Sequence, residues 1–189
     1  MTKRKKWYRI LIALVFIALG IFCGLRIYQV NAEYGNIPIS TYSMKEAVEL
    51  KNCLVTVTDF QFGEVDSILN AYHVDPESYE RQTGEERIGI VTVEVENPTN
   101  EIQTLESYLI ALRIFNLTLT SDSMKFSLFN SDDQSPFLEL EPNQKAEINL
   151  PYFFRDVQLT DNWKDVDTAP VDCVLQTYPE RKVVHVRES

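Results

Sequence analysis

Alternation of apolar and polar residues runs through most of the chain beyond residue 50 and predicts β-strands. It is clear in residues 51–62, KNCLVTVTDFQF, and clearest in residues 87–96, RIGIVTVEVE, where β-branched side chains repeat with a period of two. The turn Asn97-Pro98-Thr99-Asn100 ends the second of these strands, because proline has no N–H for the ladder and asparagine tolerates turn geometry. Both segments are therefore predicted strands.

The same pattern predicts a mainly β fold. Further short strands are expected at residues 124–130, 136–140, 144–154, 171–178 and 182–186. Residues 105–120 are ambiguous between a buried strand pair and a helix, although alternation favours a strand in their second half. Residues 64–82 predict a loop with a short helix, and residues 155–170 a long polar loop with Trp163 folded back. Seven or eight short strands with regular turns predict an antiparallel β-sandwich.

The N-terminal pattern is different and predicts a transmembrane helix over residues 10–28. The run ILIALVFIALGIFCGL, residues 10–25, is uncharged and would make about 24 Å of helix. Trp7 and Tyr28 fit interfacial positions at its two ends, and Arg9 and Arg26 can extend their guanidinium groups to the interfaces. These four residues are the predicted flanks of a membrane anchor.

Charge predicts the orientation of this helix. Five basic residues precede the apolar run, and only Arg26 follows it before Lys45, so the positive-inside rule places the N-terminus in the cytoplasm. We therefore expect a cytoplasmic basic tail (1–9), a transmembrane helix (10–28), a stalk (29–43) and an extracytoplasmic domain (44–189), in a single-pass protein of the cell membrane.

Two other interpretations of the N-terminus stay open. Val30-Asn31-Ala32 resembles a signal-peptide cleavage site, although Arg26 and bulky residues lie between it and the apolar run. Cys23 could be a lipid-modified cysteine, but the bulky Phe22 stands where such processing needs a small residue. A small apolar residue of the helix is the simpler interpretation of Cys23.

The predicted outer domain is strongly acidic. Beyond residue 28 the chain has 12 basic and 28 acidic residues, a net charge near −16. Such a surface repels phosphate backbones, which excludes general nucleic-acid binding, and it attracts cationic peptides, basic proteins or divalent cations.

Two strand-turn units carry a resemblance to known families. VTVEVENPTN, followed about forty residues later by LELEPNQKAEINLPYFF, resembles immunoglobulin-like extracytoplasmic domains of Gram-positive surface proteins, and TYSMKEAVEL resembles the start of membrane-anchored families of unknown function from these bacteria. Where those domains usually have glycine after the second proline this chain has Asn143, which a left-handed turn still allows. The resemblance implies an immunoglobulin-like sandwich and surface exposure, and no catalytic residue.

Motifs of catalysis are absent from the sequence, so we expect no enzymatic activity and no cofactor. His73 and His185 lack ligands at metal-site spacing, and His185 fits a surface or edge-strand position. The sequence contains no Gly-x-Ser-x-Gly or Ser-x-x-Lys motif. Asp161, Asp165 and Asp167 could offer oxygens to Ca²⁺, but the glycine and closing glutamate of an EF-hand are missing, which favours a solvated acidic loop.

Cys53 and Cys173 form a possible disulfide. The bond would close a loop of 120 residues and stabilise the domain by about 5 kcal/mol if unstrained. Oxidising exposure favours it, while two buried free thiols are the alternative.

The function predicted from these features is non-catalytic binding of a protein or peptide partner at the cell surface. The alternative is a structural subunit of a membrane complex, assembled through the small-xxx-small spacing of Gly20 and Gly24; an unrecognised hydrolase is a further one. An exposed aromatic patch from Tyr152, Phe153, Phe154 or Trp163 would favour the binding function.

Overall fold

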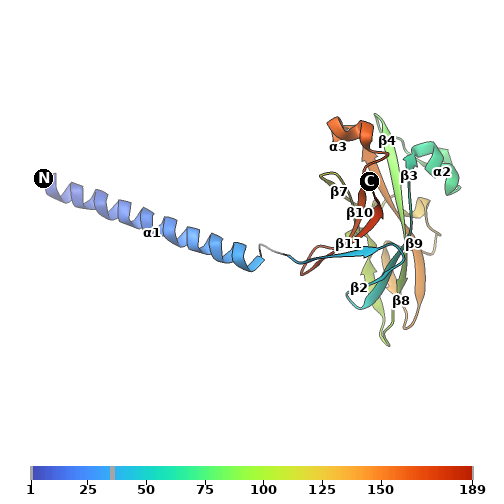
Figure 1. Ribbon diagram of the computed structural model, residues 1–189, viewed down its shortest axis with the longest axis horizontal. Coiled ribbons are helices and arrows are strands. Elements are labelled where there is room, and N and C mark those ends of the chain that lie inside the picture. Colours follow the sequence, from blue (N-terminus) through green and yellow to red (C-terminus); the bar gives the residue numbers. More distant parts are fainter. Residues whose placement is uncertain (1, 35–36, 189) are drawn as a thin grey trace. The chain divides into compact units, whose positions relative to one another are not determined.

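The computed structural model of the protein describes residues 2–34 and 37–188, without the side chains of residues 2–6, 8–11, 13, 31, 33 and 34. The chain forms two units, residues 1–38 and 39–189. Helix α1 (Thr2–Tyr34) makes up the first unit, and Figure 1 shows it as one continuous helix.

The predicted transmembrane segment 10–28 lies within α1, and its residues 10, 11 and 13 have side chains outside the described set. Among the residues that the structure describes, none of the helices combines the length and the apolar character that crossing a membrane requires.

The second unit is a sandwich-like β-domain of three sheets. The first sheet has the order β1 (Ile39–Ser43), β11 (Arg181–Arg187), β10 (Val171–Gln176), β6 (Ala111–Ile114) and β7 (Leu117–Thr120). The second has the order β2 (Ala47–Leu50), β3 (Cys53–Glu64), β4 (Glu86–Glu96) and β9 (Lys145–Arg155), and the third pairs β5 (Gln103–Glu106) with β8 (Phe137–Leu140). The prediction of a wholly antiparallel fold is wrong, because β1 pairs in parallel with β11.

The main hydrophobic core lies between the two larger sheets. Alternate residues of β3 and β4, such as Val55, Val57 and Val93, are fully buried there with Leu112 of β6 and Cys173 of β10. Each strand sends every second side chain into this layer, which is the period of two that the sequence predicts.

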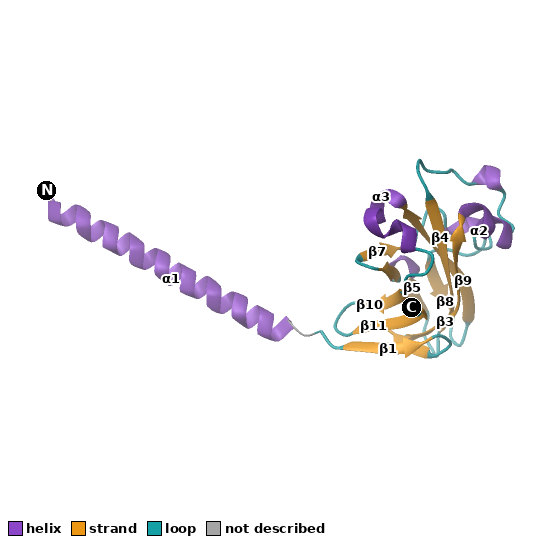
Figure 2. Cartoon of the chain, turned by 45° about the horizontal axis from the view of Figure 1, so that its top comes forward, coloured by secondary structure: helices purple, strands orange, loops and turns teal. Residues whose placement is uncertain are grey.

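Strand β4 is buried on its outer face as well. Ile88 and Ile90 point away from the main core and pack in a second cluster with residues of α2 (Val65–Ala71). The short 3-10 helices η1 (Pro76–Ser78) and η3 (Phe126–Leu128) border this cluster through Tyr79 and Phe129. Figure 2 shows α2 and α3 (Asp156–Leu159) at the same end of the sheet.

The predicted stalk over 29–43 is wrong at both ends. Residues 29–34 continue α1, and residues 39–43 form β1, which pairs with β11 from Ile39 opposite Arg181 to Ser43 opposite His185. The polar character of ISTYS suits a strand that has a neighbour on one side only.

Two further predictions about local structure are wrong. Residues 124–130 form η3 and turns, because the Asp122 carboxylate accepts the backbone N–H groups of Met124 and Lys125 and starts a turn. The predicted loop 155–170 contains α3 and the 3-10 helix η4 (Thr160–Asp165).

The prediction that Trp163 folds back is confirmed. The side chain packs against the main core, and its Nε1 donates to Glu85 at 2.6 Å. The short helix expected within residues 64–82 is also present, as α2.

Asn97 joins three segments at the end of β4. Its fully buried side chain donates from Nδ2 to the carbonyls of Glu101, Leu140 and Glu141 at 2.8, 3.0 and 3.1 Å, and its Oδ1 accepts from the Thr99 backbone N–H at 3.0 Å. Its own carbonyl accepts from Asn143, which has φ +60°. The two turns that carry the sequence resemblance are thus hydrogen-bonded to each other, and Asn143 adopts the left-handed conformation that the sequence allows.

Asn97→Ala should lower the free energy of unfolding by about 3 kcal/mol, because it leaves buried carbonyls without donors. Urea denaturation followed by circular dichroism measures this effect. The matched control is Asn100→Ala, an exposed asparagine three residues along the same turn, for which we expect almost no change. Equal stability of the two variants would contradict the role of Asn97.

Candidate functional site

The structure brings Cys53 and Cys173 into one core as free thiols. Both are buried in the main cluster, Cys53 on β3 and Cys173 on β10. Burial raises the pKa of the Cys173 thiol to about 12 and raises that of Cys53 as well, so both stay protonated at neutral pH. A disulfide between them stays a prediction.

The two histidines lie apart. His73 is an exposed residue with positive φ after α2. His185 is a surface residue, but its strand β11 lies between β1 and β10 and is not an edge. Its Nδ1 lies 2.6 Å from Asp172 Oδ1, and Asp172 also pairs with Arg113. Burial opposes ionisation of Asp172, but hydrogen bonds from Arg113 and His185 outweigh it, so the pKa of Asp172 is lowered.

The acidic loop shows a structural role. The Asp167 carboxylate accepts hydrogen bonds from Nε and Nη2 of Arg87, at 2.9 and 3.2 Å. These bonds connect the loop to β4. Within residues 2–34 and 37–188, no group of three or more His, Cys, Asp or Glu side chains could hold a metal ion.

The predicted anchor flanks and the four aromatic candidates are the remaining residues that the sequence analysis named. Trp7, Arg26 and Tyr28 are exposed on α1, whereas the side chain of Arg9 lies outside the described set. Of the four aromatic candidates, Tyr152 and Phe154 are fully buried, and Phe153 and Trp163 are partly buried. They form no common exposed patch.

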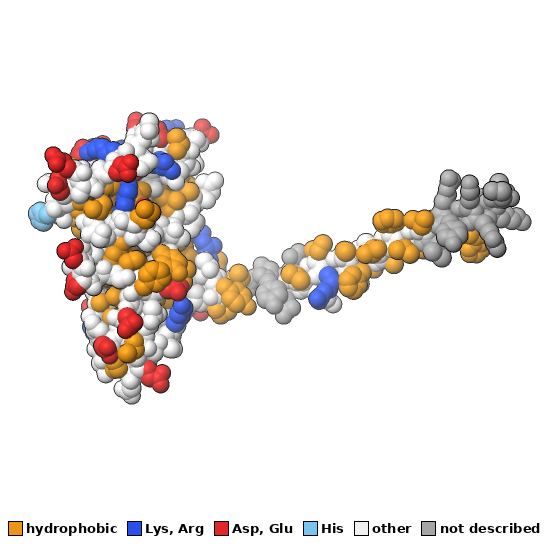
Figure 3. Space-filling model, turned by 180° about the vertical axis from the view of Figure 1, so that it is seen from behind, with side chains coloured by type: hydrophobic (Ala, Val, Ile, Leu, Met, Phe, Trp, Pro, Cys, Tyr) orange, Lys and Arg blue, Asp and Glu red, His pale blue; other side chains and the backbone are white. Residues whose placement is uncertain are grey.

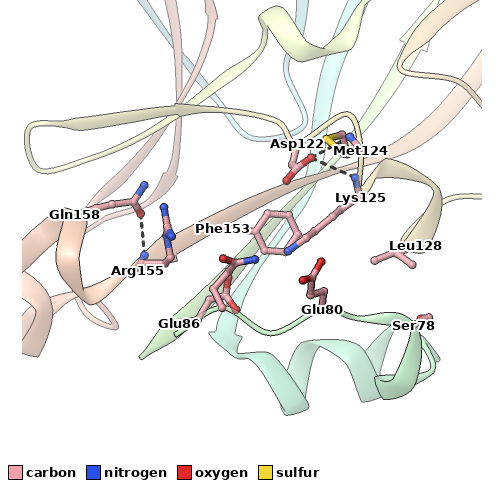
Figure 4. Close-up of a pocket in the computed structure, with 11 residues that line it drawn as sticks. Ser78, Glu80, Glu86, Asp122, Met124, Lys125, Leu128, Phe153, Arg155 and Gln158 are labelled. Carbon is pink, nitrogen blue, oxygen red and sulfur yellow. Dashed lines mark hydrogen bonds between the residues drawn. The ribbon is translucent and has the colours of Figure 1, made fainter. Parts of the chain in front are cut away.

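Phe153 instead borders a cavity of about 550 Å³ beside the second hydrophobic cluster. Figure 4 shows its ring among charged side chains that come from the 78–86 segment, from the η3 loop and from the end of β9. The lining residues are Ser78, Glu80, Gln82, Glu86, Asp122, Met124, Lys125, Leu128, Phe153, Arg155 and Gln158. The volume falls within the usual range of ligand sites.

An ammonium group already lies against the aromatic wall. Lys125 Nζ is 4.3 Å from the ring centroid of Tyr79 and 4.2 Å from that of Phe153. The two rings stack with their centroids 5.8 Å apart. Both distances are within the range of a cation–π interaction, so the faces of these rings hold the positive charge in place.

Glu86 is the buried acidic group of the cavity. The residue is only 9% exposed, and neither its Oε1 nor the Tyr79 hydroxyl has a hydrogen-bond partner in the described part of the chain. Burial and the neighbouring Glu86 raise the pKa of Tyr79 well above its ordinary value, so its hydroxyl stays a donor. A carboxylate has about four acceptor positions, so even a turn of that hydroxyl toward Glu86 would leave capacity open.

Four charged side chains of the cavity are unpaired. None of the ion pairs formed by the described residues includes Lys125, Arg155, Glu80 or Glu86. Asp122 differs, because it caps the turn before η3. The cavity therefore offers two cations and two anions that are not neutralised by one another.

The sequence held one signal for this site. Glu86, Ile88 and Ile90 share a face of β4, and both isoleucines are fully buried, so a carboxylate stands at a core position of the strand alternation. Tyr79, Lys125 and Arg155 gave no such signal, because only the folding of separate loops brings them together.

Comparison with protein families gives one match that spans most of the chain. The model described as "Domain of unknown function (DUF5028)" matches residues 39–182, which include every strand of the domain up to the first residues of β11. No curated protein matches the chain.

Comparison with solved structures gives matches to proteins of Gram-positive bacteria. A conserved hypothetical protein of Bacillus anthracis is 20% identical, with a TM-score of 0.49 over 74% of this chain and 94% of the other. An uncharacterised β-sandwich protein of Clostridium difficile is 12% identical, with a TM-score of 0.46 over 80% and 97%. A functionally unknown protein of Listeria monocytogenes is 10% identical, with a TM-score of 0.45 over 67% and 69%.

Glu86→Met should raise the free energy of unfolding by about 1 kcal/mol, because it replaces a buried and unpaired carboxylate by an apolar side chain of similar length. Chemical denaturation of the full chain in detergent measures the change, with Glu139→Met on the exposed side of β8 as the control. A clear loss of stability would mean that Glu86 is held by interactions within the domain.

Proposed function

The chain belongs to the DUF5028 family of domains of unknown function, and we propose that it is a membrane-anchored binding domain whose cavity beside Phe153 holds a ligand outside the cytoplasm. In this proposal the β-domain has an immunoglobulin-like character and acts without catalysis, on a protein or peptide partner at the cell surface.

Unpaired charge in the cavity is the observation that supports binding. A buried carboxylate costs free energy unless partners satisfy it, and Oε1 of Glu86 accepts no hydrogen bond within the described domain, although the Tyr79 hydroxyl lies beside this carboxylate. Unsatisfied buried groups are expected at functional or strained sites, and a ligand could supply the missing donors here.

The proposed anchor rests on the apolar surface of α1. Leu14, Val15, Phe16 and Ile17 are 59%, 50%, 70% and 58% exposed, and consecutive helix residues point about 100° apart. Figure 3 shows apolar side chains along the described part of this helix. A helix that is apolar on all sides must be buried in protein or in lipid. A basic segment before the helix and an acidic domain after it in the sequence favour lipid.

Packing of α1 against another membrane helix is the second candidate function. A Cβ at Gly20 or at Gly24 would meet nothing within 4 Å, so this side of the helix leaves room for the close approach of a partner backbone. In that case α1 would assemble a membrane complex, and the β-domain would be its outer part.

Deletion of residues 10–25 should release the protein from membranes, because it removes the apolar surface that lipid would cover. Carbonate extraction of cell membranes measures this: the full chain should stay in the pellet and the deletion variant should be found in the supernatant. Protease treatment of intact cells should degrade the β-domain and leave an N-terminal tag protected. Release of the full chain by carbonate, or protection of the β-domain, would contradict the anchor or its orientation.

A partner bound by the β-domain should co-purify with the full chain and with a chain that starts at Ala32. Pull-down from solubilised membranes with mass spectrometry measures this. Gly20→Ile with Gly24→Ile is the matched variant for the helix, and it should retain the partner. A partner lost from the shortened chain and from the glycine variant would instead support assembly through α1.

A further inference from the structure

We propose that the cavity beside Phe153 binds a zwitterionic ligand of amino-acid size, whose carboxylate is held by Lys125 and Arg155 and whose ammonium group is held by Glu86 and Glu80. This inference rests on the proposed binding function and adds the chemical class of the ligand. An amino acid and a short peptide share this chemistry.

Lys125 and Arg155 supply the site for the carboxylate. The faces of Tyr79 and Phe153 stabilise the Lys125 charge, but they are poor acceptors for the three N–H donors of an ammonium group. Arg155 follows Phe153 by two residues along β9 and lines the same cavity. Figure 4 shows Lys125 and Arg155 approaching from different elements, with the Phe153 ring between them in this view. A ligand carboxylate would give both cations an acceptor.

Glu86 and Glu80 supply the site for the ammonium group. Oε1 of Glu86 is buried and unpaired, and Glu80 is an exposed residue on the rim of the same cavity. An ammonium group that enters would donate to Glu86 inside the protein, where the interaction is stronger than in water. Glu80 would add an acceptor at the entrance.

A ligand of one charge would fit less well. A simple cation would meet Lys125 and Arg155, and a simple anion would meet Glu80, Glu86 and Asp122, all of which line the cavity. Like charges at close range oppose binding in a partly desolvated site. A ligand that carries both charges pairs Lys125 and Arg155 with its carboxylate, and the two glutamates with its ammonium group.

The remaining wall is suited to an apolar side chain. Met124, Leu128 and Phe153 line the cavity, and Met124 is 90% exposed. A cavity of about 550 Å³ has room for an amino acid or a dipeptide. Leucine is therefore a suitable probe, since it combines both charges with an apolar side chain.

The experiment is calorimetric titration of the full chain in detergent micelles with leucine, glycyl-leucine and leucyl-glycine. Two analogues of leucine each lack one charge: 4-methylpentanoate has no ammonium group and 3-methylbutylamine has no carboxylate. We expect leucine or one of the dipeptides to bind. Both analogues should bind at least about tenfold more weakly, because each leaves two charged side chains of the protein unpaired. The better of leucine and the dipeptides then identifies a free amino acid or a peptide.

Variants test the two halves of the site separately. Lys125→Met and Glu86→Gln should each weaken binding of the best zwitterion about tenfold or more, whereas Lys164→Met and Glu139→Gln, at exposed positions outside the cavity, should leave it unchanged. Thermal unfolding of each variant verifies that it is folded, and Arg155→Gln replaces Lys125→Met if that variant is not.

Three results would overturn the inference. Equal binding of 3-methylbutylamine and leucine by the unaltered chain would show a site for simple cations, and equal binding of 4-methylpentanoate and leucine would show a site for anions. No heat with any zwitterion at 10 mM, a concentration about tenfold above a 1 mM dissociation constant, would exclude the proposed ligand class. The pull-down of membrane partners is independent of these probes, so it would still test the proposed function.

Discussion

Burial of β4 on both faces is the constraint on which the rest of the domain depends. Its inner face completes the main core, and its outer face, with Ile88 and Ile90, would meet water unless other elements covered it. The chain supplies that cover from α2 and η1, which connect β3 to β4, and from η3, which lies further along the sequence. On β4 the second cluster extends over Ile90 and Ile88 and ends next to Glu86. The cavity begins there, and Glu86 is one of its lining residues. The site is therefore a consequence of covering this strand incompletely.

The strands were predictable where their side chains alternate, and less so where packing decides. Residues 51–62 and 87–96 match β3 and β4 closely because a half-buried or buried strand needs this alternation. Residues 124–130 form a 3-10 turn because the Asp122 carboxylate accepts the N–H groups of Met124 and Lys125 and starts a turn where the apolar residues predict a strand. The parallel pairing of β1 was not predictable, since its partner lies at the opposite end of the chain.

The site was less predictable than the fold. Sequence motifs find chemistry when its residues lie near one another along the chain, and here the aromatic wall combines Tyr79, Phe153 and the ammonium group of Lys125 from three loops and strands. Asn97 shows the contrasting case. Its neighbours in sequence form the turn that it stabilises, and its side chain also donates hydrogen bonds to the carbonyls of Leu140 and Glu141. The two turns that carry the sequence resemblance therefore contact each other in the structure.

The position of Lys125 bears on how the cavity could bind. A flexible lysine next to a buried carboxylate would ordinarily pair with it, because the attraction is strong away from water. Here the backbone N–H of Lys125 is held by Asp122, and its ammonium group is held by two ring faces, so the side chain is kept from neutralising Glu86. Opposite charges that are fixed apart lose little conformational freedom when a ligand bridges them, and this lowers the free-energy cost of binding. The stability lost by leaving Glu86 unpaired and the affinity gained for a bridging ligand would thus have the same structural origin.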